Sequence, residues 1–396
     1  MNNYIRHTLT ALLLFFAASA TNINAQTGNP DSIRFSLLTC SPGQEIYNLF
    51  GHTAIRCEYP EMGIDYVFNY GVFNFRAPNF VWRFVKGETD YMLAVEPYPD
   101  FVAGYKYNNR SIWQQRLNLT ATEKAKLFQL LHTNALPENR VYRYSFFYDN
   151  CSTRPRDRIE ECIEGEVVYD EIAPRKTFRN IVHECTEGYP WQRFGMDLCL
   201  GSDADELVSY RLEMFAPFYL MDAFKTAKII DKEGNERALA APPEIIVSAA
   251  PMQKNTVVFT PMRAALLLLI LIGAITLYGI KKKKSFWAID LLLFASAGIA
   301  GCVIAFLMFF SEHPSVDANY LLILLQPLHL LLLPFFIRKE IRREKSCYHT
   351  LNFIALTLFI VLWLIIPQHF NFAVLPLALS LLIRSGSNLV LTYKKK

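Results

Sequence analysis

Residues 51–70 have the sequence GHTAIRCEYPEMGIDYVFNY, which predicts a β-hairpin. In both halves apolar and polar side chains alternate, as in strands with one buried face. Between them, residues 60–63 (Pro-Glu-Met-Gly) have the composition of a tight turn. A turn centred there places His52 near Asn69 or Gly71, on the same face as Asn69, because the register of a hairpin follows its turn.

Further elements are predicted downstream of this hairpin. Strands are expected over residues 91–95 and 114–119, and an aromatic strand over 141–147. The sequence Thr-Ala-Thr-Glu at 120–123 is a capping box that opens a helix. After Cys151, apolar residues recur at helical spacing. The part of the chain before residue 251 therefore has an α+β pattern, with Cys151 at the junction of a strand and a helix.

A cysteine at the start of a helix is favoured as a nucleophile. A helix N-terminus lowers the pKa of a cysteine, and the thiolate is the nucleophilic form. A cysteine nucleophile also needs a base that a third group orients. His52, which begins a predicted strand, is the best-placed histidine of this part of the chain. On pattern alone a structural or disulfide-bonded Cys151 and a hydrogen-bonded core His52 remain open.

The two ends of the chain indicate export and membrane insertion. Residues 1–25 resemble a signal peptide, with a weakly basic start, about twelve apolar residues and a cleavage site, although a retained anchor is the alternative. The segment is short for a span, which needs about 20 residues. We expect an exported catalytic domain over 26–250 and an all-α, five-helix transmembrane domain over 251–396.

The prediction of five helices comes from apolar runs and flanking charges. Basic clusters follow the first, third and fifth runs, whereas the other two connecting loops lack Lys and Arg. The positive-inside rule then places the C-terminus in the cytoplasm and the N-terminal domain outside. Asp290 and Arg384 are expected to snorkel to the cytoplasmic interface, and His329 to lie in a polar cavity or a packed core. The five runs are 264–280, 286–310, 320–337, 351–366 and 370–391.

Composition excludes several classes of function. The net charge is only +4, and the excess lies in loops beside the apolar runs, so nucleic acid is not an expected partner. The eight cysteines form no CxxC metal pattern, and neither a metal nor a diffusible cofactor is expected. Six of them lie in the exported part, where disulfides are permitted.

Five longer motifs occur in order between residues 35 and 218: LFGHTAIR, DYVFNYGVFNF, LNLTATEKAKL, PENRVYRYSFFYDNCSTRPRD and FGMDLCLGSDAD. They resemble the Lnb N-terminal periplasmic domain family, and the multi-span C-terminal half is similar to the rest of its full-length members. The resemblance implies a bacterial inner-membrane lipoprotein N-acyltransferase with a periplasmic catalytic domain.

The order of histidine first and Asn-Cys second also resembles circularly permuted papain-like (NlpC/P60-like) enzymes, including the lecithin:retinol acyltransferase group. By that similarity Cys151 is the nucleophile, His52 the base and Asn69 the residue that orients the imidazole. The sequence NCST departs from the NCEHF of the retinol enzymes, so details of their substrates do not transfer.

Four further residues are candidate substrate contacts. Glu45 and Tyr47 precede the histidine motif on a short predicted helix over 43–50, where they line the site or form a solvated helix face. Arg110 and Arg154 either hold a phospholipid head group or belong to a salt-bridge network around the cysteine helix.

The expected reaction moves an acyl chain from a phospholipid to Cys151 as a thioester, and then to the α-amino group of the N-terminal diacylglyceryl-cysteine of a lipoprotein. One alternative is a membrane-anchored cysteine amidase or peptidase acting on peptidoglycan. Another is a non-enzymatic envelope sensor or scaffold in which Cys151 is bonded to a second cysteine.

Overall fold

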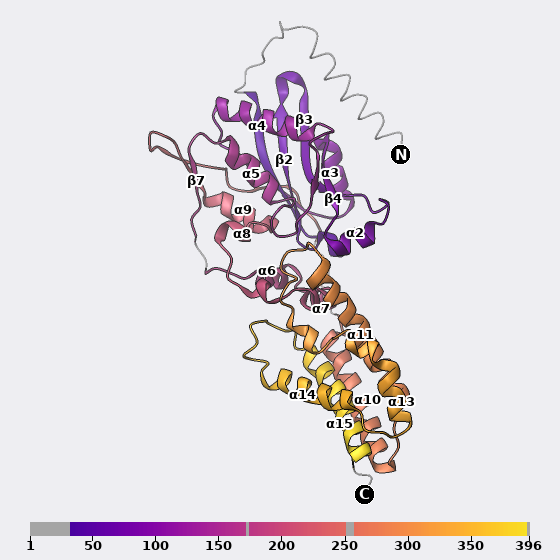
Figure 1. Ribbon diagram of the computed structural model, residues 1–396. Coiled ribbons are helices and arrows are strands. Elements are labelled where there is room, and N and C mark those ends of the chain that lie inside the picture. Colours follow the sequence, from indigo (N-terminus) through magenta and orange to yellow (C-terminus); the bar gives the residue numbers. More distant parts are fainter. Residues whose placement is uncertain (1–31, 172–173, 251–256, 394–396) are drawn as a thin grey trace.

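The computed structural model describes residues 32–171, 174–250 and 257–393. Figure 1 shows an N-terminal domain with a central sheet, joined end-on to a bundle of long helices that carries the C-terminus. The predicted signal peptide, 1–25, lies outside the described residues.

The N-terminal domain is built on a seven-stranded antiparallel sheet in the order β10-β5-β1-β2-β3-β4-β6. The predicted hairpin is confirmed as β2 and β3, which pair in the expected way. The predicted strand over 141–147 is shorter, because a turn closed by hydrogen bonds between Ser145 and Asp149 follows β6. The strands are β1 (Arg34–Cys40), β2 (His52–Tyr59), β3 (Ile64–Val72), β4 (Asp90–Pro97), β5 (Ile112–Arg116), β6 (Val141–Arg143) and β10 (Glu244–Val247).

Helices cover both faces of this sheet. On one face, Leu127 of α4 and Ile159 of α5 are fully buried against β1, β2 and β3. On the other, Phe101 of α3 packs with apolar residues of the same strands. α4 begins with the predicted capping box, formed by Thr120 and Glu123. The helices are α2 (Phe80–Lys86), α3 (Tyr98–Tyr107), α4 (Ala121–Ala135), α5 (Thr153–Cys162), α6 (Phe178–Cys185), α7 (Pro190–Cys199), α8 (Tyr210–Glu213) and α9 (Pro217–Thr226).

A second, three-stranded antiparallel sheet has the order β7-β8-β9. Short 3-10 turns complete the domain. The strands are β7 (Glu166–Val168), β8 (Lys228–Ile230) and β9 (Glu236–Ala238), and the turns are η2 (Ile46–Asn48), η3 (Pro60–Met62) and η4 (Ser202–Asp205).

The C-terminal region is helical, and the prediction of five spans is confirmed only in a coarser form. Within the described residues, three of its helices are long and apolar enough to cross a membrane: α10 (Pro261–Lys282), α11 (Trp287–Phe310) and α15 (Val374–Tyr393). The segments Tyr320–Leu331 and Leu333–Ile341 make a fourth candidate if they are one span, bent by 73°. They contain η5 (Tyr320–Ile323), α12 (Leu328–Leu331) and α13 (Leu333–Ile341), and α14 (Cys347–Val361) has only 15 residues.

The prediction that Asp290 and Arg384 snorkel to the interface is wrong. Both are buried, and the guanidinium of Arg384 donates two hydrogen bonds to the Asp290 carboxylate and one to Thr276. A charge inside a membrane is tolerated when an opposite charge pairs with it, and this pair joins α10, α11 and α15. The ring of His329 is bonded at both nitrogens, to the Tyr348 hydroxyl and the Leu324 carbonyl, as in a packed core.

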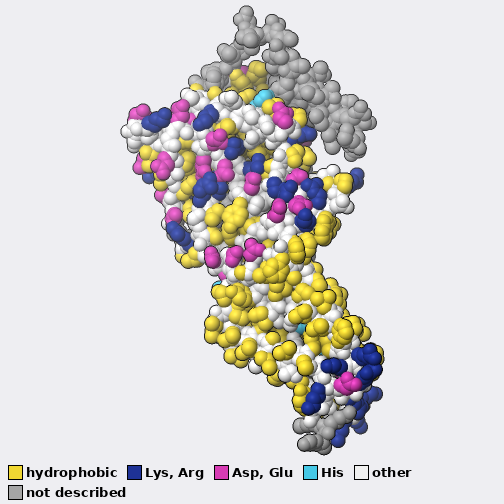
Figure 2. Space-filling model, viewed as in Figure 1, with side chains coloured by type: hydrophobic (Ala, Val, Ile, Leu, Met, Phe, Trp, Pro, Cys, Tyr) yellow, Lys and Arg dark blue, Asp and Glu magenta, His cyan; other side chains and the backbone are white. Residues whose placement is uncertain are grey.

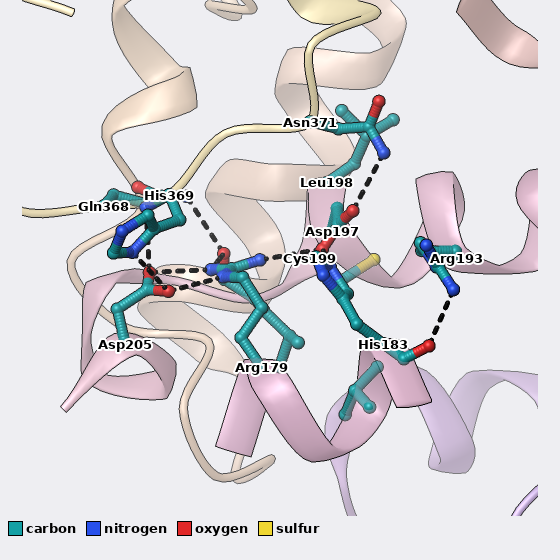
Figure 3. Close-up of polar contacts among 12 residues, drawn as sticks. Arg179, His183, Arg193, Asp197, Leu198, Cys199, Asp205, Gln368, His369 and Asn371 are labelled. Carbon is teal, nitrogen blue, oxygen red and sulfur yellow. Dashed lines mark hydrogen bonds and ion pairs between the residues drawn. The ribbon is translucent and has the colours of Figure 1, made fainter. Parts of the chain in front are cut away.

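A buried polar cluster around Arg179 of α6 joins the N-terminal domain to the helical region (Figure 3). Arg179 is 2% exposed, and its guanidinium binds the carboxylates of Asp197 and Asp205. These carboxylates in turn accept hydrogen bonds from the segment before α15: Asn371 Nδ2 at 2.9 Å and the backbone N–H of His369 at 3.0 Å. The cluster therefore fixes how the domain sits on the membrane helices.

Replacement of Arg179 by methionine is expected to lower the free energy of unfolding by about 3–5 kcal/mol, because two buried carboxylates lose their cation. Denaturant unfolding of the full-length protein in detergent measures the change. Arg175→Met is the matched control, since Arg175 is 57% exposed and pairs only loosely with Glu171 at 3.7 Å. Its loss is expected to stay below about 1 kcal/mol. Equal losses in the two variants would contradict the role assigned to the cluster.

Candidate active site

The site lies where β2 and β3 separate at the end of the sheet nearest the membrane helices (Figure 1). If the β2–β3 register continued to the start of β2, His52 would lie opposite Gly71. Counted from the hairpin turn, however, the backbone pairing ends three positions before that point, at Ile55 and Phe68. Gly71 has a φ of +89°, which favours glycine, and a Cβ there would lie 3.2 Å from the Cβ of Cys151. The glycine therefore leaves room for the cysteine to approach between the two strands.

A row of polar side chains on three consecutive strands orients the imidazole of His52. Its Nε2 lies 2.6 Å from Oδ1 of Asn69, and Nδ2 of Asn69 donates to Oε1 of Glu96 at 2.9 Å. The carboxylate can only accept, so it holds the amide with its nitrogen toward Glu96 and its oxygen toward His52. Nε2 of His52 then carries the proton, and Nδ1 is left as the basic nitrogen.

Glu96 was not predicted from the sequence. The predicted strand stopped at residue 95, whereas β4 continues to Pro97. In the β3–β4 register Asn69 pairs with Ala94, so Glu96 lies two residues further along β4, on the same face. A longer strand prediction with this register would have identified it.

The loop before α5 brings Cys151 to the start of β2. The thiol of Cys151 accepts a hydrogen bond from the backbone N–H of Thr53, the residue after His52. The hydroxyls of Thr53 and Ser152 lie 3.1 Å apart, which ties the start of α5 to β2. The structure thus joins His52 directly to Asn69 and sets Cys151 against Thr53, the residue that follows His52.

The predicted lowering of the Cys151 pKa is wrong. Burial raises the pKa of this thiol to about 11, and the hydrogen bonds from Thr53 and Ser152 offset this only in part. At the helix start, Oδ1 of Asn150 accepts the backbone N–H groups of Ser152 and Thr153 at 2.7 and 3.0 Å. These two donors are therefore taken by Asn150.

The pKa of His52 is shifted in the opposite direction. Burial lowers the pKa of His52 to about 4, against the hydrogen bond with Asn69. At neutral pH the resting pair is therefore an uncharged thiol and an uncharged imidazole. Such a pair suits general-base catalysis, in which the proton leaves sulfur as sulfur attacks.

This electrostatic state predicts a distinctive pH dependence for alkylation of Cys151. The rate of reaction with iodoacetamide is expected to rise about tenfold per pH unit between about pH 6 and pH 10, because the thiolate fraction keeps growing below a raised pKa. Mass spectrometry of the peptide that contains Cys151 measures the rate in the full-length protein. A rate that is already flat above about pH 6 would instead indicate a preformed thiolate–imidazolium pair.

Arg110 is placed to meet an anionic ligand. Its Nε donates to the Ser41 carbonyl at 2.8 Å, and its guanidinium lies over the Tyr105 ring. Its Nη2 is buried and has no hydrogen-bond partner within the described part of the chain. Arg110 lines a cavity of about 260 Å³ together with Asn69 and Glu96, and its charge lowers the pKa of both His52 and Cys151.

None of the other three predicted contacts lines the cavity beside Arg110. Arg154 forms two hydrogen bonds with Asp149, at 2.6 and 2.7 Å, and covers the Tyr142 ring, so it belongs to the salt-bridge network. Glu45 is exposed and precedes η2, which replaces the predicted helix over 43–50 with a single turn. Tyr47 is 58% exposed and packs edge-on against Phe73 and Phe75.

The described residues contain no group of three or more His, Cys, Asp or Glu side chains that could hold a metal ion. All eight cysteines lie in the described part, and all are free thiols.

Comparison with known families gives two matches. Residues 20–184 match the family model described as the Lnb N-terminal periplasmic domain, and residues 253–396 match the one described as the Lnb transmembrane domain. No curated protein and no solved structure matches the chain. The two family matches together cover most of the chain, including His52, Asn69 and Cys151 in the first.

Proposed function

Because the chain belongs to the Lnb family, with a periplasmic N-terminal domain and transmembrane helices consistent with the inner membrane, we propose that it is a lipoprotein N-acyltransferase with Cys151 as nucleophile. The observation that supports this proposal is the row from Glu96 through Asn69 to His52, together with the hydrogen bond that the next residue, Thr53, donates from its backbone N–H to the Cys151 thiol. An imidazole oriented by an amide beside a cysteine also favours a circularly permuted papain-like fold for the domain.

In the first half-reaction, Nδ1 of His52 takes the thiol proton while sulfur attacks an acyl ester of a phospholipid. The carbon–oxygen ester bond breaks, and the proton passes from His52 to the departing oxygen. A lysophospholipid leaves, and the acyl chain remains on Cys151 as a thioester.

In the second half-reaction, the α-amino group of a diacylglyceryl-cysteine at a lipoprotein N-terminus attacks the thioester. His52 takes the proton that the amine loses and returns it to the sulfur as the carbon–sulfur bond breaks. The products are an amide-linked acyl chain and the free thiol. A thioester suits this route because an amine cleaves it readily, so one difficult transfer becomes two easier ones.

The charge of Arg110 suits the donor. Its free Nη2 binds a phosphate oxygen of the phospholipid, or the oxyanion that forms at the attacked carbonyl. Both substrates are anchored in the outer leaflet of the inner membrane, and the site lies at the end of the sheet nearest the helices. This arrangement raises the effective concentration of donor and acceptor at the thiol.

The proposal is tested by reconstituting the full-length protein in phospholipid vesicles with a diacylated lipopeptide. Mass spectrometry is expected to find a triacylated lipopeptide and an equal amount of lysophospholipid. If the protein were an amidase or peptidase, lysophospholipid would be absent and added peptidoglycan stem peptides would be shortened. That result would overturn the proposal.

A further inference from the structure

An exposed apolar patch surrounds α2 of the N-terminal domain. We call it the α2 patch and define it as Phe75, Val81, Trp82 and Phe84, which are 58, 74, 56 and 46% exposed. Grouped apolar side chains of this size are unusual on a surface that faces only water, and they mark sites of contact with a membrane or a partner.

The α2 patch is attached to the end of a span-length helix. The ring of Trp82 on α2 lies 5.0 Å from the ring of Phe306, which is in the last turns of α11. After α11, the Ser311 hydroxyl donates to the Val85 carbonyl, and the backbone N–H of Glu312 donates to the Lys86 carbonyl, both at 2.8 Å. These bonds place the patch at the level where α11 leaves the membrane.

The hydrophobic surface is continuous across this junction. Figure 2 shows apolar side chains covering the helical region and continuing onto the adjoining face of the N-terminal domain. The basic side chains of α2 bind within the domain: Arg83 pairs with Asp90, and Lys86 with Glu88. α2 therefore has the two faces of an interfacial helix, and tryptophan is typical of that depth.

An unbroken row of aromatic rings leads inward from α2. Phe80 of α2 stacks with Phe73 at 6.0 Å, Phe73 contacts Tyr91 at 4.9 Å, and Tyr91 stacks on Tyr144 at 4.0 Å. We call these four residues the aromatic row. All except Tyr91 are only partly buried, so the row presents apolar surface.

The aromatic row ends at the nucleophile. A Cβ built on Gly71 would lie 3.8 Å from the Tyr144 ring and 3.2 Å from the Cβ of Cys151. The aromatic row thus joins the membrane level to the neighbourhood of the thiol. The cavity beside Arg110 is different in character, because it is lined by the polar side chains of Asn69 and Glu96.

We infer that the α2 patch inserts into the outer leaflet and that a phospholipid acyl chain passes from there along the aromatic row to Cys151. Insertion follows from the patch and its attachment to α11. Delivery of the chain to Cys151 rests on the proposed function.

Photo-crosslinking tests the insertion. The full-length protein is reconstituted in phosphatidylethanolamine–phosphatidylglycerol vesicles that contain a phospholipid with a diazirine on its acyl chain. Crosslinks are expected on peptides covering residues 73–84, with a loss of about tenfold in Val81→Glu. The matched control is Met62→Glu, which alters a 50% exposed apolar residue in the turn at the other end of the β2–β3 hairpin. Absence of crosslinks from 73–84, or equal crosslinking in both variants, would overturn the inference.

Acyl transfer tests the delivery. Val81→Glu is expected to lower transfer from vesicle phospholipid about tenfold, while alkylation of Cys151 by iodoacetamide and transfer by Met62→Glu stay unchanged. Unchanged transfer by Val81→Glu would contradict delivery through the patch. If the wild type transfers no acyl chain, the proposed function fails, and the crosslinking still decides the insertion.

Discussion

Replacement of Cys151 by alanine is expected to abolish acyl transfer, because no thioester forms without the thiol. The loss should reach the uncatalysed background, about 10⁴-fold or more, as when the nucleophile of a coupled catalytic pair is removed. Release of lysophospholipid and formation of triacylated lipopeptide, both measured in vesicles by mass spectrometry, report the loss.

Cys347→Ala is the control for this variant, since Cys347 is an exposed cysteine at the start of α14. It is expected to retain full activity. Activity in Cys151→Ala that matches this control would contradict the mechanism and favour a non-enzymatic role for the domain.

Replacement of His52 by alanine is expected to lower kcat by about 10²–10⁴-fold, the usual contribution of a general base. KM should change little, because the imidazole acts on the thiol proton and not on the bound lipid. Since the pKa of His52 is about 4, the rate of lysophospholipid release in the first half-reaction should persist into mildly acidic conditions and fall only as the pH approaches that value.

His132→Ala supplies the comparison, because this histidine lies on α4 and takes no part in the row formed by Glu96, Asn69 and His52. Its kcat is expected to match that of the wild type. A His52 variant with an unchanged kcat would remove the base from the mechanism, whatever the effect on KM.

The sequence predicted the part of the site that lies on the hairpin. Strand alternation has a period of two, and the turn at 60–63 fixes the register, so the faces of His52 and Asn69 follow from residue spacing alone. Glu96 did not follow, because its contact with Asn69 depends on the extension of β4 to Pro97 and on the β3–β4 pairing that sets Asn69 opposite Ala94. Tertiary pairing, and not local pattern, selects that residue.

The charge state of Cys151 could not be predicted from the local sequence pattern either. A helix start indicates a lowered pKa, yet burial outweighs it. The amide of Asn150 takes the first helix donors, and Arg154 turns to Asp149. Both effects depend on which side chains fold onto the loop, which the order of residue types does not specify.

The apolar runs located the membrane helices but not their lengths or contacts. Composition identifies an apolar segment, whereas the 73° bend between the segments that meet near residue 332 is a matter of three-dimensional packing. The partner of Asp290 lies 94 residues away on another helix, so the burial of this pair has no local signature. Interfacial snorkelling was the simpler prediction for each residue taken alone.

The acyl-enzyme itself tests the central claim most directly. Full-length protein is incubated with a phospholipid that carries a deuterated acyl chain, without acceptor, and its peptides are examined by mass spectrometry. The labelled chain is expected on Cys151, removable by neutral hydroxylamine or by a diacylated lipopeptide, and absent from His52→Ala. An acceptor that becomes acylated while Cys151 stays unmodified at every time point would contradict the account.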